Sequence, residues 1–247
     1  MNEKMEKQLK VIYEDKDILV CFKPAGIATQ TAKISEQDMV SGIKNYLGKQ
    51  GQGKAPYVGV IHRLDQPVSG LLVFAKNQKA AASLSKQIQD GNANKDYIAF
   101  CTGIIEEKQG SLVHYIGKDP MTKLAKVVNK KQYEEEVEDT KEQVELSYKK
   151  AILTYEVESE FADVSIIKVH LQTGRFHQIR GQLSFIGHPL LGDAKYGTAV
   201  SRELSMKKRI SKIALCAYRL VLKHPTTGKE MEFVLEDKYL PEWYKKV

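Results

Sequence analysis

Short apolar segments separated by Gly, Pro and polar turns recur along the 247-residue chain, and this pattern limits the folds available to it. Helical patterns are fewer: Asn77 is placed to cap a helix that runs to about Asp90, and a second pattern covers 173–187. Many strands with few helices predict an α+β fold with flanking helices on a mixed, largely antiparallel sheet. The segments with the length and composition of strands are 18–23, 58–61, 70–75, 97–101, 112–116, 152–157, 164–171, 213–222 and 229–234.

The segment 173–187 is the clearest helix prediction. Thr173 is expected at its N-cap, and Arg175 in its first turn, where a helix N-terminus favours anions. His177, Arg180 and Ser184 fall together on one face of this helix. The expected apolar stripe comprises Phe176, Ile179, Leu183 and Ile186. From periodicity alone, a basic amphipathic surface helix explains this pattern slightly better than a binding site does.

Composition excludes several classes of protein. Hydrophobic residues make up 42% and charged residues 28%, as in ordinary globular proteins, and no apolar run reaches the roughly 18 residues of a membrane span. Lys and Arg number 38 against 31 Asp and Glu, and the net charge of +7 suits a nucleic-acid partner without requiring one. Three scattered cysteines in apolar surroundings predict buried free thiols and a cytoplasmic location.

Two segments stand out by charge. The segment 131–147 holds seven acidic residues against two lysines, and we expect an exposed insertion there that does not face RNA. The segment 202–212 carries five basic residues, which suit either phosphate contacts or an ordinary solvated surface.

The segment 62–70, between two predicted strands, is the first candidate site. It places His62, Arg63 and Asp65 directly before a near-continuous apolar run that ends at Lys76. A buried strand behind a charged turn can hold reactive groups in fixed positions. An ordinary polar turn with an Arg–Asp pair is the alternative explanation.

Together, the segments 62–70 and 173–193 resemble the signatures of the RluA-type pseudouridine synthases. The first resembles His-Arg-Leu-Asp-x-x-Thr-Ser-Gly, and the second resembles Thr-Gly-Arg-x-His-Gln-Ile-Arg followed by Gly-His-Pro-x-x-Gly-Asp. Shorter matches occur at 22–26, 95–99 and 196–197. The resemblance extends from about Val11 to the late strands, so it covers nearly the whole chain.

This resemblance implies a single catalytic domain over 1–247 with a central cleft. The S4-like RNA-binding module common in the family is not expected, because the residues before Val11 are too few to form it. Val68 stands where the family has Thr, and Gly181 and Gln182 replace the more usual apolar-His pair. Together with the acidic insertion, these departures are expected to affect the choice of RNA substrate more than the catalytic chemistry.

The resemblance also implies the reaction, in which an isomerase converts uridine in RNA to pseudouridine. Asp65 matches the family's aspartate, either as a nucleophile at C1′ or as a base toward the ribose. A carboxylate suits chemistry at an anomeric carbon, as in retaining glycosidases. Arg175 is the implied counter-ion of Asp65, and Tyr97 the implied active-site tyrosine that packs on the uracil.

Further implied contacts are with the RNA. Arg63 matches the residue that takes the place of the flipped nucleotide, while His62, His177 and Arg180 match positions for phosphate contact or scaffold. The reaction is redox-neutral and breaks no phosphate bond, so we expect no cofactor. Since neither His-Glu-x-x-His nor Cys-x-x-Cys occurs, we expect no metal. The implied partner is structured RNA, ribosomal or transfer, with no membrane, no obligatory protein partner and a monomeric enzyme.

Two other classes of function are weighed against the isomerase. A catalytically idle RNA-binding or assembly factor would be favoured if Asp65, Tyr97 or Arg175 were missing, and all three are present. A glycosidase-like or nuclease enzyme would need a second carboxylate near Asp65. Asp193 is the only other acid within a motif, and its Gly-Asp turn is typical of a structural role.

Overall fold

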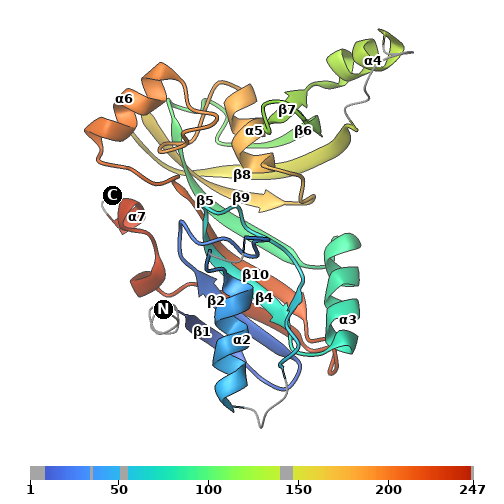
Figure 1. Ribbon diagram of the computed structural model, residues 1–247. Helices are drawn as coiled ribbons and strands as arrows, with labels where there is room; N and C mark the ends of the chain where they lie inside the picture. The colour runs from blue at the N-terminus through green and yellow to red at the C-terminus, as the bar shows by residue number, and fades with distance from the viewer. Residues whose placement is uncertain (1–8, 34–35, 51–54, 140–146, 246–247) are drawn as a thin grey trace. The chain divides into compact units, whose positions relative to one another are not determined.

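The computed structural model describes residues 9–33, 36–50, 55–139 and 147–245, which form two compact units (Figure 1). Unit 1 consists of Met1–Lys95 and Cys216–Val247, and unit 2 consists of Asp96–Leu215. Each unit contains a β-sheet and helices, so the predicted α+β class is confirmed. The single catalytic domain and its central cleft stay predictions.

The sheet of unit 1 confirms the mixed, largely antiparallel arrangement. Its described strands pair antiparallel, except that β4 and β10 run parallel. Along this sheet the order is β1 (Lys10–Glu14), β2 (Ile18–Lys23), β4 (Ser69–Ala75), β10 (Leu215–Lys223) and β11 (Glu230–Val234), with β3 (Gly59–Val60) also on β4.

Gly70 makes the parallel pairing of β4 with β10 possible. It lies opposite Ala217 and has a φ of +135°, where a side chain is strained. A Cβ at this position would also collide with the backbone of Ala217. The glycine that ends the 62–70 motif is therefore required by close strand packing.

The first predicted helix of unit 1 is confirmed as α3 (Gln78–Gln89). The Asn77 side chain caps it by accepting a hydrogen bond from the Ala80 amide at 2.8 Å. Leu84 packs with Ile18 and Val73 in the core of the sheet. The other helical elements of this unit are α2 (Met39–Gln50), a 3-10 turn (Asp237–Tyr239) and α7 (Glu242–Lys245).

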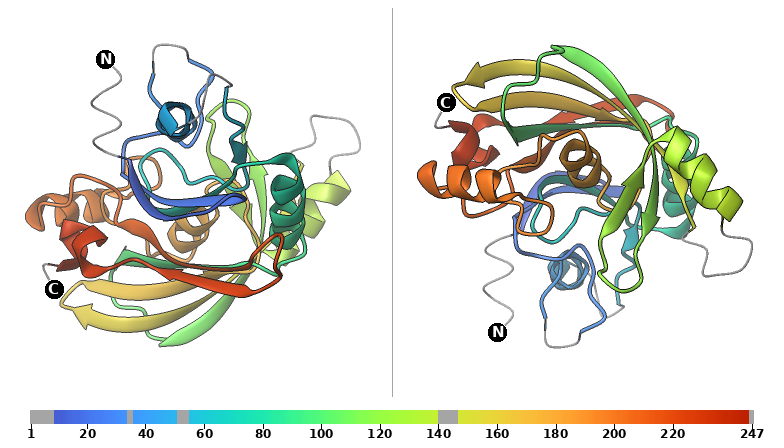
Figure 2. Two further views of the ribbon diagram at one scale, coloured as in Figure 1. Left: turned by 90° about the horizontal axis from the view of Figure 1, so that it is seen from below. Right: turned by 90° about the horizontal axis from the view of Figure 1, so that it is seen from above.

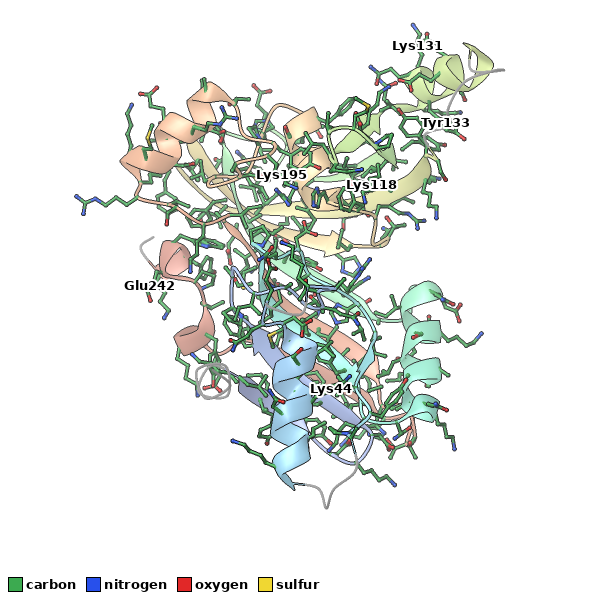
Figure 3. The ribbon with its side chains drawn as sticks, viewed as in Figure 1. Lys44, Lys118, Lys131, Tyr133, Lys195 and Glu242 are labelled. Atoms are coloured by element: carbon green, nitrogen blue, oxygen red, sulfur yellow. The ribbon has the colours of Figure 1, made fainter. Side chains whose placement is uncertain are left out.

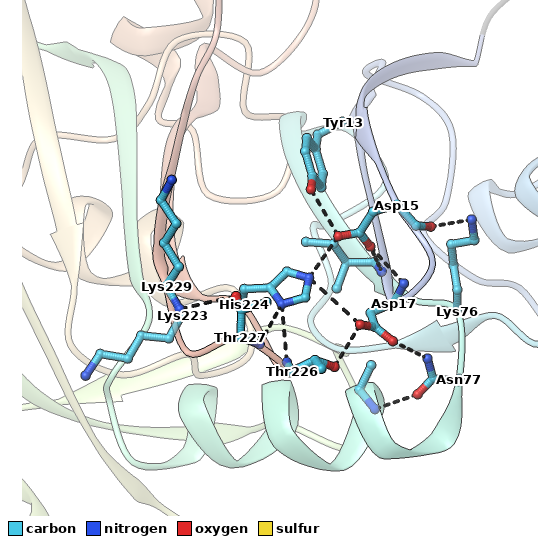
Figure 4. A network of polar contacts seen from close by, with 12 residues as sticks. Tyr13, Asp15, Asp17, Lys76, Asn77, Lys223, His224, Thr226, Thr227 and Lys229 are labelled. Atoms are coloured by element: carbon cyan, nitrogen blue, oxygen red, sulfur yellow. Dashed lines mark hydrogen bonds and ion pairs between the residues drawn. The ribbon is translucent and has the colours of Figure 1, made fainter.

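A polar network joins three turns of unit 1 (Figure 4). His224 donates from Nε2 to Asp15 at 2.8 Å, because its Nδ1 accepts from the amides of Thr226 and Thr227. Asp17 accepts from the Thr226 hydroxyl and from the Asn77 amide. These contacts connect the β1–β2 turn to the β10–β11 hairpin and to the start of α3.

Unit 2 has a sheet of antiparallel strands, in which the long β8 and β9 run side by side (Figure 2). The order is β5 (Asn94–Thr102), β9 (Val164–Leu171), β8 (Lys149–Phe161), β6 (Gln109–Lys118) and β7 (Ala125–Val128). The helices are α4 (Lys130–Asp139), α5 (Gln178–Phe185) and α6 (Ala199–Lys207). Of the predicted acidic insertion at 131–147, residues 140–146 lie outside the described residues, and its described start belongs to α4.

The predicted bounds of the helix at 173–187 are wrong. α5 begins at Gln178, and its N-cap is His177 in the left-handed conformation, with a φ of 49°. Phe176 precedes the helix and is exposed, whereas Ile179 and Leu183 are buried as expected. The reason is tertiary: hydrogen bonds from the 173–178 segment to β8 take the place of a first helical turn.

Two predictions from composition can also be compared with the structure. Cys21, Cys101 and Cys216 are buried free thiols, as predicted. Across the described ranges, no helix is long and apolar enough to pass through a membrane.

Candidate active site

Unit 1 carries Asp65 on the turn between β3 and β4. The Thr29 hydroxyl fastens this turn because it accepts from the Leu64 amide at 3.2 Å and donates to the Leu64 carbonyl at 3.1 Å. On the other side, the Val68 amide donates to the Asp65 carbonyl at 3.0 Å. Leu64 and Val68 are buried, while Asp65 is half-buried and Arg63 exposed. The backbone is thus held on both sides of a half-buried aspartate.

A buried lysine lies beside this carboxylate. Lys23, the last residue of β2, has no solvent exposure, and its ammonium donates to the carbonyls of Pro24, Ile27 and Gln66 at 3.2, 2.6 and 3.0 Å. Burial lowers the pKa of Lys23 to about 7, and the Asp65 charge acts in the opposite direction. The three carbonyl acceptors and the Asp65 charge favour the ammonium form against burial, so Lys23 brings a positive charge to the Asp65 turn below about pH 7.

Replacing Lys23 with Met is expected to lower the free energy of unfolding by about 2 kcal/mol, because three carbonyls lose their donor. Urea unfolding against Lys44→Met, at an exposed position on α2 (Figure 3), measures this change in the free energy of unfolding.

The stability contributed by Lys23 should also depend on pH. The pKa of Lys23 in the folded protein is below its unfolded value of about 10.4. The unfolded chain then binds more protons above pH 7, so the wild type should gain stability relative to Lys23→Met as pH rises from 7 to 10. Equal stability of the wild type and Lys23→Met at all pH values would contradict this role.

His62 is half-buried on the strand side of the turn. Its Nε2 accepts a hydrogen bond from the Val73 amide at 3.3 Å, which requires a ring without a proton on that nitrogen. Burial, assisted by the Lys95 ammonium, lowers the pKa of His62 to about 3. A neutral ring bonded to β4 favours the scaffold role over phosphate contact.

In unit 2, the segment 173–178 is held against β8 by hydrogen bonds. Thr173 accepts from the Ile152 amide at 2.8 Å, and the Gln178 side chain donates to the Ile152 carbonyl at 3.1 Å. The same Gln178 side chain accepts from the Thr173 hydroxyl and from the Arg175 amide, both at 2.9 Å. Arg175 itself is exposed, and its Nε donates to the Lys150 carbonyl at 2.9 Å. β8 therefore determines where Arg175 lies.

Tyr196 contacts His177, the N-cap of α5, and two polar residues within this helix, Arg180 and Ser184. Its hydroxyl accepts from the Ala125 amide at 2.6 Å and contacts His177 Nδ1 at 2.7 Å. Its ring lies 5.0 Å from the Arg180 guanidinium, and its carbonyl accepts from Ser184 at 3.0 Å. The predicted grouping of His177, Arg180 and Ser184 on one side of the helix is confirmed.

Arg180 is buried, and its guanidinium binds Asp193 through two hydrogen bonds, Nε to Oδ2 and Nη2 to Oδ1, each 2.8 Å long. Burial raises the pKa of Asp193, but Arg180 and the amides of Lys195 and Tyr196 outweigh it, and the net pKa is below its usual range. This geometry confirms a structural role for Asp193. It also favours the scaffold role of Arg180 over phosphate contact.

Tyr97 lies on β5 opposite Val169 of β9 and is almost fully buried. Its neighbours along β5 form a ladder with β9, so the position of its backbone is determined by the sheet of unit 2.

The predicted site residues therefore fall into two groups. His62, Arg63 and Asp65 share one turn of unit 1, whereas Tyr97, Arg175, His177 and Arg180 belong to unit 2. The pairing of Asp65 with Arg175 stays a prediction. Among the described residues, no three His, Cys, Asp or Glu side chains are grouped as metal ligands.

Two residues with defined contacts in the structure, Lys23 and Tyr196, have no role predicted from the sequence. Lys23 and Tyr196 both lie in short matches to the family, yet their function depends on carbonyls and side chains far away in the sequence. A lysine at the end of an otherwise apolar strand is the signal that points to Lys23.

Two solved structures have the same fold as this chain. The human RNA pseudouridylate synthase domain containing 4 protein matches with a TM-score of 0.76 and 21% identity, over 99% of this chain and 94% of that one. The human domain containing 1 protein matches with a TM-score of 0.72 and 24% identity, over 96% and 87%. The fold is thus that of the pseudouridine synthases.

Sequence comparison then identifies the family. Residues 17–185 match the family model described as RNA pseudouridylate synthase. An uncharacterized RNA pseudouridine synthase of Aquifex aeolicus is 31% identical over 97% of this chain and 72% of its own length. A ribosomal large subunit pseudouridine synthase D of Zymomonas mobilis is 32% identical over 95% and 71%. This chain belongs to the RNA pseudouridylate synthase family, whose members are isomerases that convert uridine to pseudouridine in RNA.

Proposed function

We propose that this chain isomerises one or more specific uridines in structured RNA to pseudouridine, with ribosomal RNA as the favoured substrate over transfer RNA. The observation that carries the proposal is the Asp65 turn, which holds a half-buried aspartate beside the buried amino group of Lys23. Relatives named as ribosomal large subunit synthases support the ribosomal substrate. The enzyme acts as a monomer without an obligatory protein partner or cofactor.

In the proposed reaction, the bond between C1′ and N1 of uridine breaks and the bond between C1′ and C5 forms. N1 gains a proton and C5 loses one, so the atoms balance without a redox step. Asp65 either attacks C1′ and later leaves, or removes a proton from the ribose. In both routes the carboxylate must stay ionised when the base covers it, and positive charges nearby favour the ionised form.

The other residues have supporting roles in this proposal. Arg175 supplies the second positive charge to Asp65, and Tyr97 packs on the uracil and assists the loss of the C5 proton. Arg63 is exposed on the same turn as Asp65, where it can enter the RNA helix in place of the flipped nucleotide. The scaffold of the Asp65 turn is maintained by His62. The scaffold around α5 is maintained by His177 and Arg180.

RNA labelled with tritium at uridine C5 tests the proposal. The wild-type protein is expected to release tritium from large-subunit ribosomal RNA, because C5 must exchange its hydrogen for the bond to C1′. Transfer RNA carrying the same label is expected to release less. Binding of both RNAs without any release would contradict the proposal and favour the idle RNA-binding factor. Mapping of the modified uridines in cells with and without the gene identifies the target.

A further inference from the structure

An exposed aromatic ring, that of Phe176, lies on unit 2, the same unit as several cations that form no ion pair with a described residue. We call it the Phe176 patch, and it comprises Lys118, Lys149, Arg175, Phe176 and Lys195. Lys118 and Lys149 lie on the same side of the sheet, because Ile116 pairs with Lys149 and Lys118 follows Ile116 by two positions on β6. The Lys118 ammonium lies 5.1 Å from the centre of the Phe176 ring. Figure 3 labels Lys118 and Lys195 on this unit.

The exposure of Phe176 is imposed by its surroundings. The hydrogen bonds of Arg175 and Gln178 hold the segment before α5, and His177 is in the left-handed conformation. Phe176 therefore cannot turn into the core stripe, and it remains 38% exposed. Its ring stacks on the His177 imidazole, with 3.8 Å between ring centres and an angle of 22°. His177 is in turn bonded to Tyr196, next to Lys195.

The charge of the patch is not neutralised by described residues. Many other lysines of unit 2 pair with a glutamate, for example Lys126 with Glu136 and Lys207 with Glu203, at 2.9 and 2.8 Å. In the described part of the chain, Lys118, Lys149 and Lys195 take part in no such ion pair. Asp119, the acidic residue that follows Lys118 in the sequence, accepts hydrogen bonds from the amides of Met121 and Thr122.

A ligand that fits this surface must present both negative charges and a flat aromatic face. Exposed aromatic rings stack on unpaired bases, and lysines bind the neighbouring phosphates of a single strand. We propose that the Phe176 patch binds an unpaired stretch of the substrate RNA, in which a base stacks on the face of the Phe176 ring that is turned away from His177. Lys118 then moves from the ring to a phosphate, and Lys149 and Lys195 bind neighbouring phosphates. This inference rests on the proposed function, since it names a further contact with the same substrate. Because Arg175 belongs both to the patch and to the proposed active site, the stretch lies close to the target uridine.

Filter binding and tritium release with the same RNA test the patch. Phe176→Ala is expected to weaken RNA binding by roughly 10-fold and to raise KM more than it lowers kcat. Phe176→Tyr keeps a ring of similar size and should restore binding. Melting temperatures close to that of the wild type would show that the variants fold.

The salt dependence of binding tests the lysines. Replacing Lys118, Lys149 or Lys195 with Ala should reduce the slope of log K against log salt by about 0.7 for each lost phosphate contact. Lys130→Ala and Lys131→Ala are the matched controls, because both lysines are exposed but paired with glutamates. Their slopes should equal that of the wild type.

The outcomes separate this inference from the proposed function. If the wild type releases tritium but Phe176→Ala and Lys118→Ala bind RNA as tightly as the controls, the patch is refuted and the isomerase stands. If the wild type binds RNA through the patch but releases no tritium from any RNA, the isomerase is refuted instead.

Discussion

Asp65→Asn is expected to abolish tritium release, with a loss in kcat on the order of 10³-fold or more. The amide has the size of the carboxylate but no charge, so it can neither stabilise a cation-like sugar nor take up a proton. RNA binding should change little, because the exposed cations of both units are untouched by the substitution. Single-turnover release from labelled RNA measures the chemical step, and filter binding measures the affinity.

A matched control for this variant is Asp90→Asn, at the exposed C-terminal end of α3. It makes the same chemical change in the same unit, far along the chain from the Asp65 turn. Its release rate should equal that of the wild type. Unchanged release in Asp65→Asn, with a melting temperature like that of the wild type, would remove Asp65 from the reaction.

Much of the fold can be predicted from the sequence where local pattern and tertiary environment agree. The strands at 18–23 and 164–171 have the predicted bounds, because continuous apolar runs there are ended by turn residues. α3 begins at its predicted cap, Asn77, because that hydrogen bond involves residues three positions apart. β7 was not predicted, since a strand of four residues is too short to display a period.

The start of α5 could not be predicted from local pattern. Phe176 has the spacing of a core residue, yet it is exposed, because the Gln178 side chain bonds to Ile152 across 26 positions of sequence. The burial of Lys23 has the same origin, since the carbonyl of Gln66 is 43 positions away. Contacts of this length leave no periodic trace in the sequence.

The unusual pair Gly181 and Gln182 also has a physical explanation in the structure. A Cβ on Gly181 would approach the Val127 side chain to 2.9 Å, so the glycine allows α5 to lie close to β7. Gln182 is fully buried and contacts His114 Nδ1 at 3.0 Å and the Leu112 carbonyl at 3.2 Å. The departure from the family pattern therefore affects how α5 packs against β6 and β7.

The second large effect is expected at the ion pair of Arg180 with Asp193. Arg180→Leu leaves a buried carboxylate without its cation, and the free energy of unfolding should fall by about 3–5 kcal/mol. The side chains are 4% and 0% exposed, so solvent cannot replace the lost hydrogen bonds. Urea unfolding at neutral pH measures the change.

A double-mutant cycle separates the pair from its parts. Arg180→Leu with Asp193→Leu removes both charges, and the loss of stability should be smaller than the sum of the two single losses. Arg202→Leu, on an exposed position of α6, is a control that changes the same residue type without a buried partner. Additive losses in the cycle would show that the two side chains do not depend on each other.

Acid titration gives an independent test of the same pair, because the pKa of Asp193 is lower in the folded protein than in the unfolded chain. The unfolded chain then binds more protons as pH falls below about 4, so the wild type loses the contribution of the pair there and retains it at higher pH. Asp193→Asn has no such group, and its stability should fall less steeply on acidification. Parallel pH profiles for the wild type and Asp193→Asn would contradict this assignment. Gln178 holds the Arg175 segment against β8, and Arg180 follows Gln178 by two residues. Weakening the pair of Arg180 with Asp193 should therefore also lower the rate of tritium release, at temperatures where Asp193→Asn is still folded.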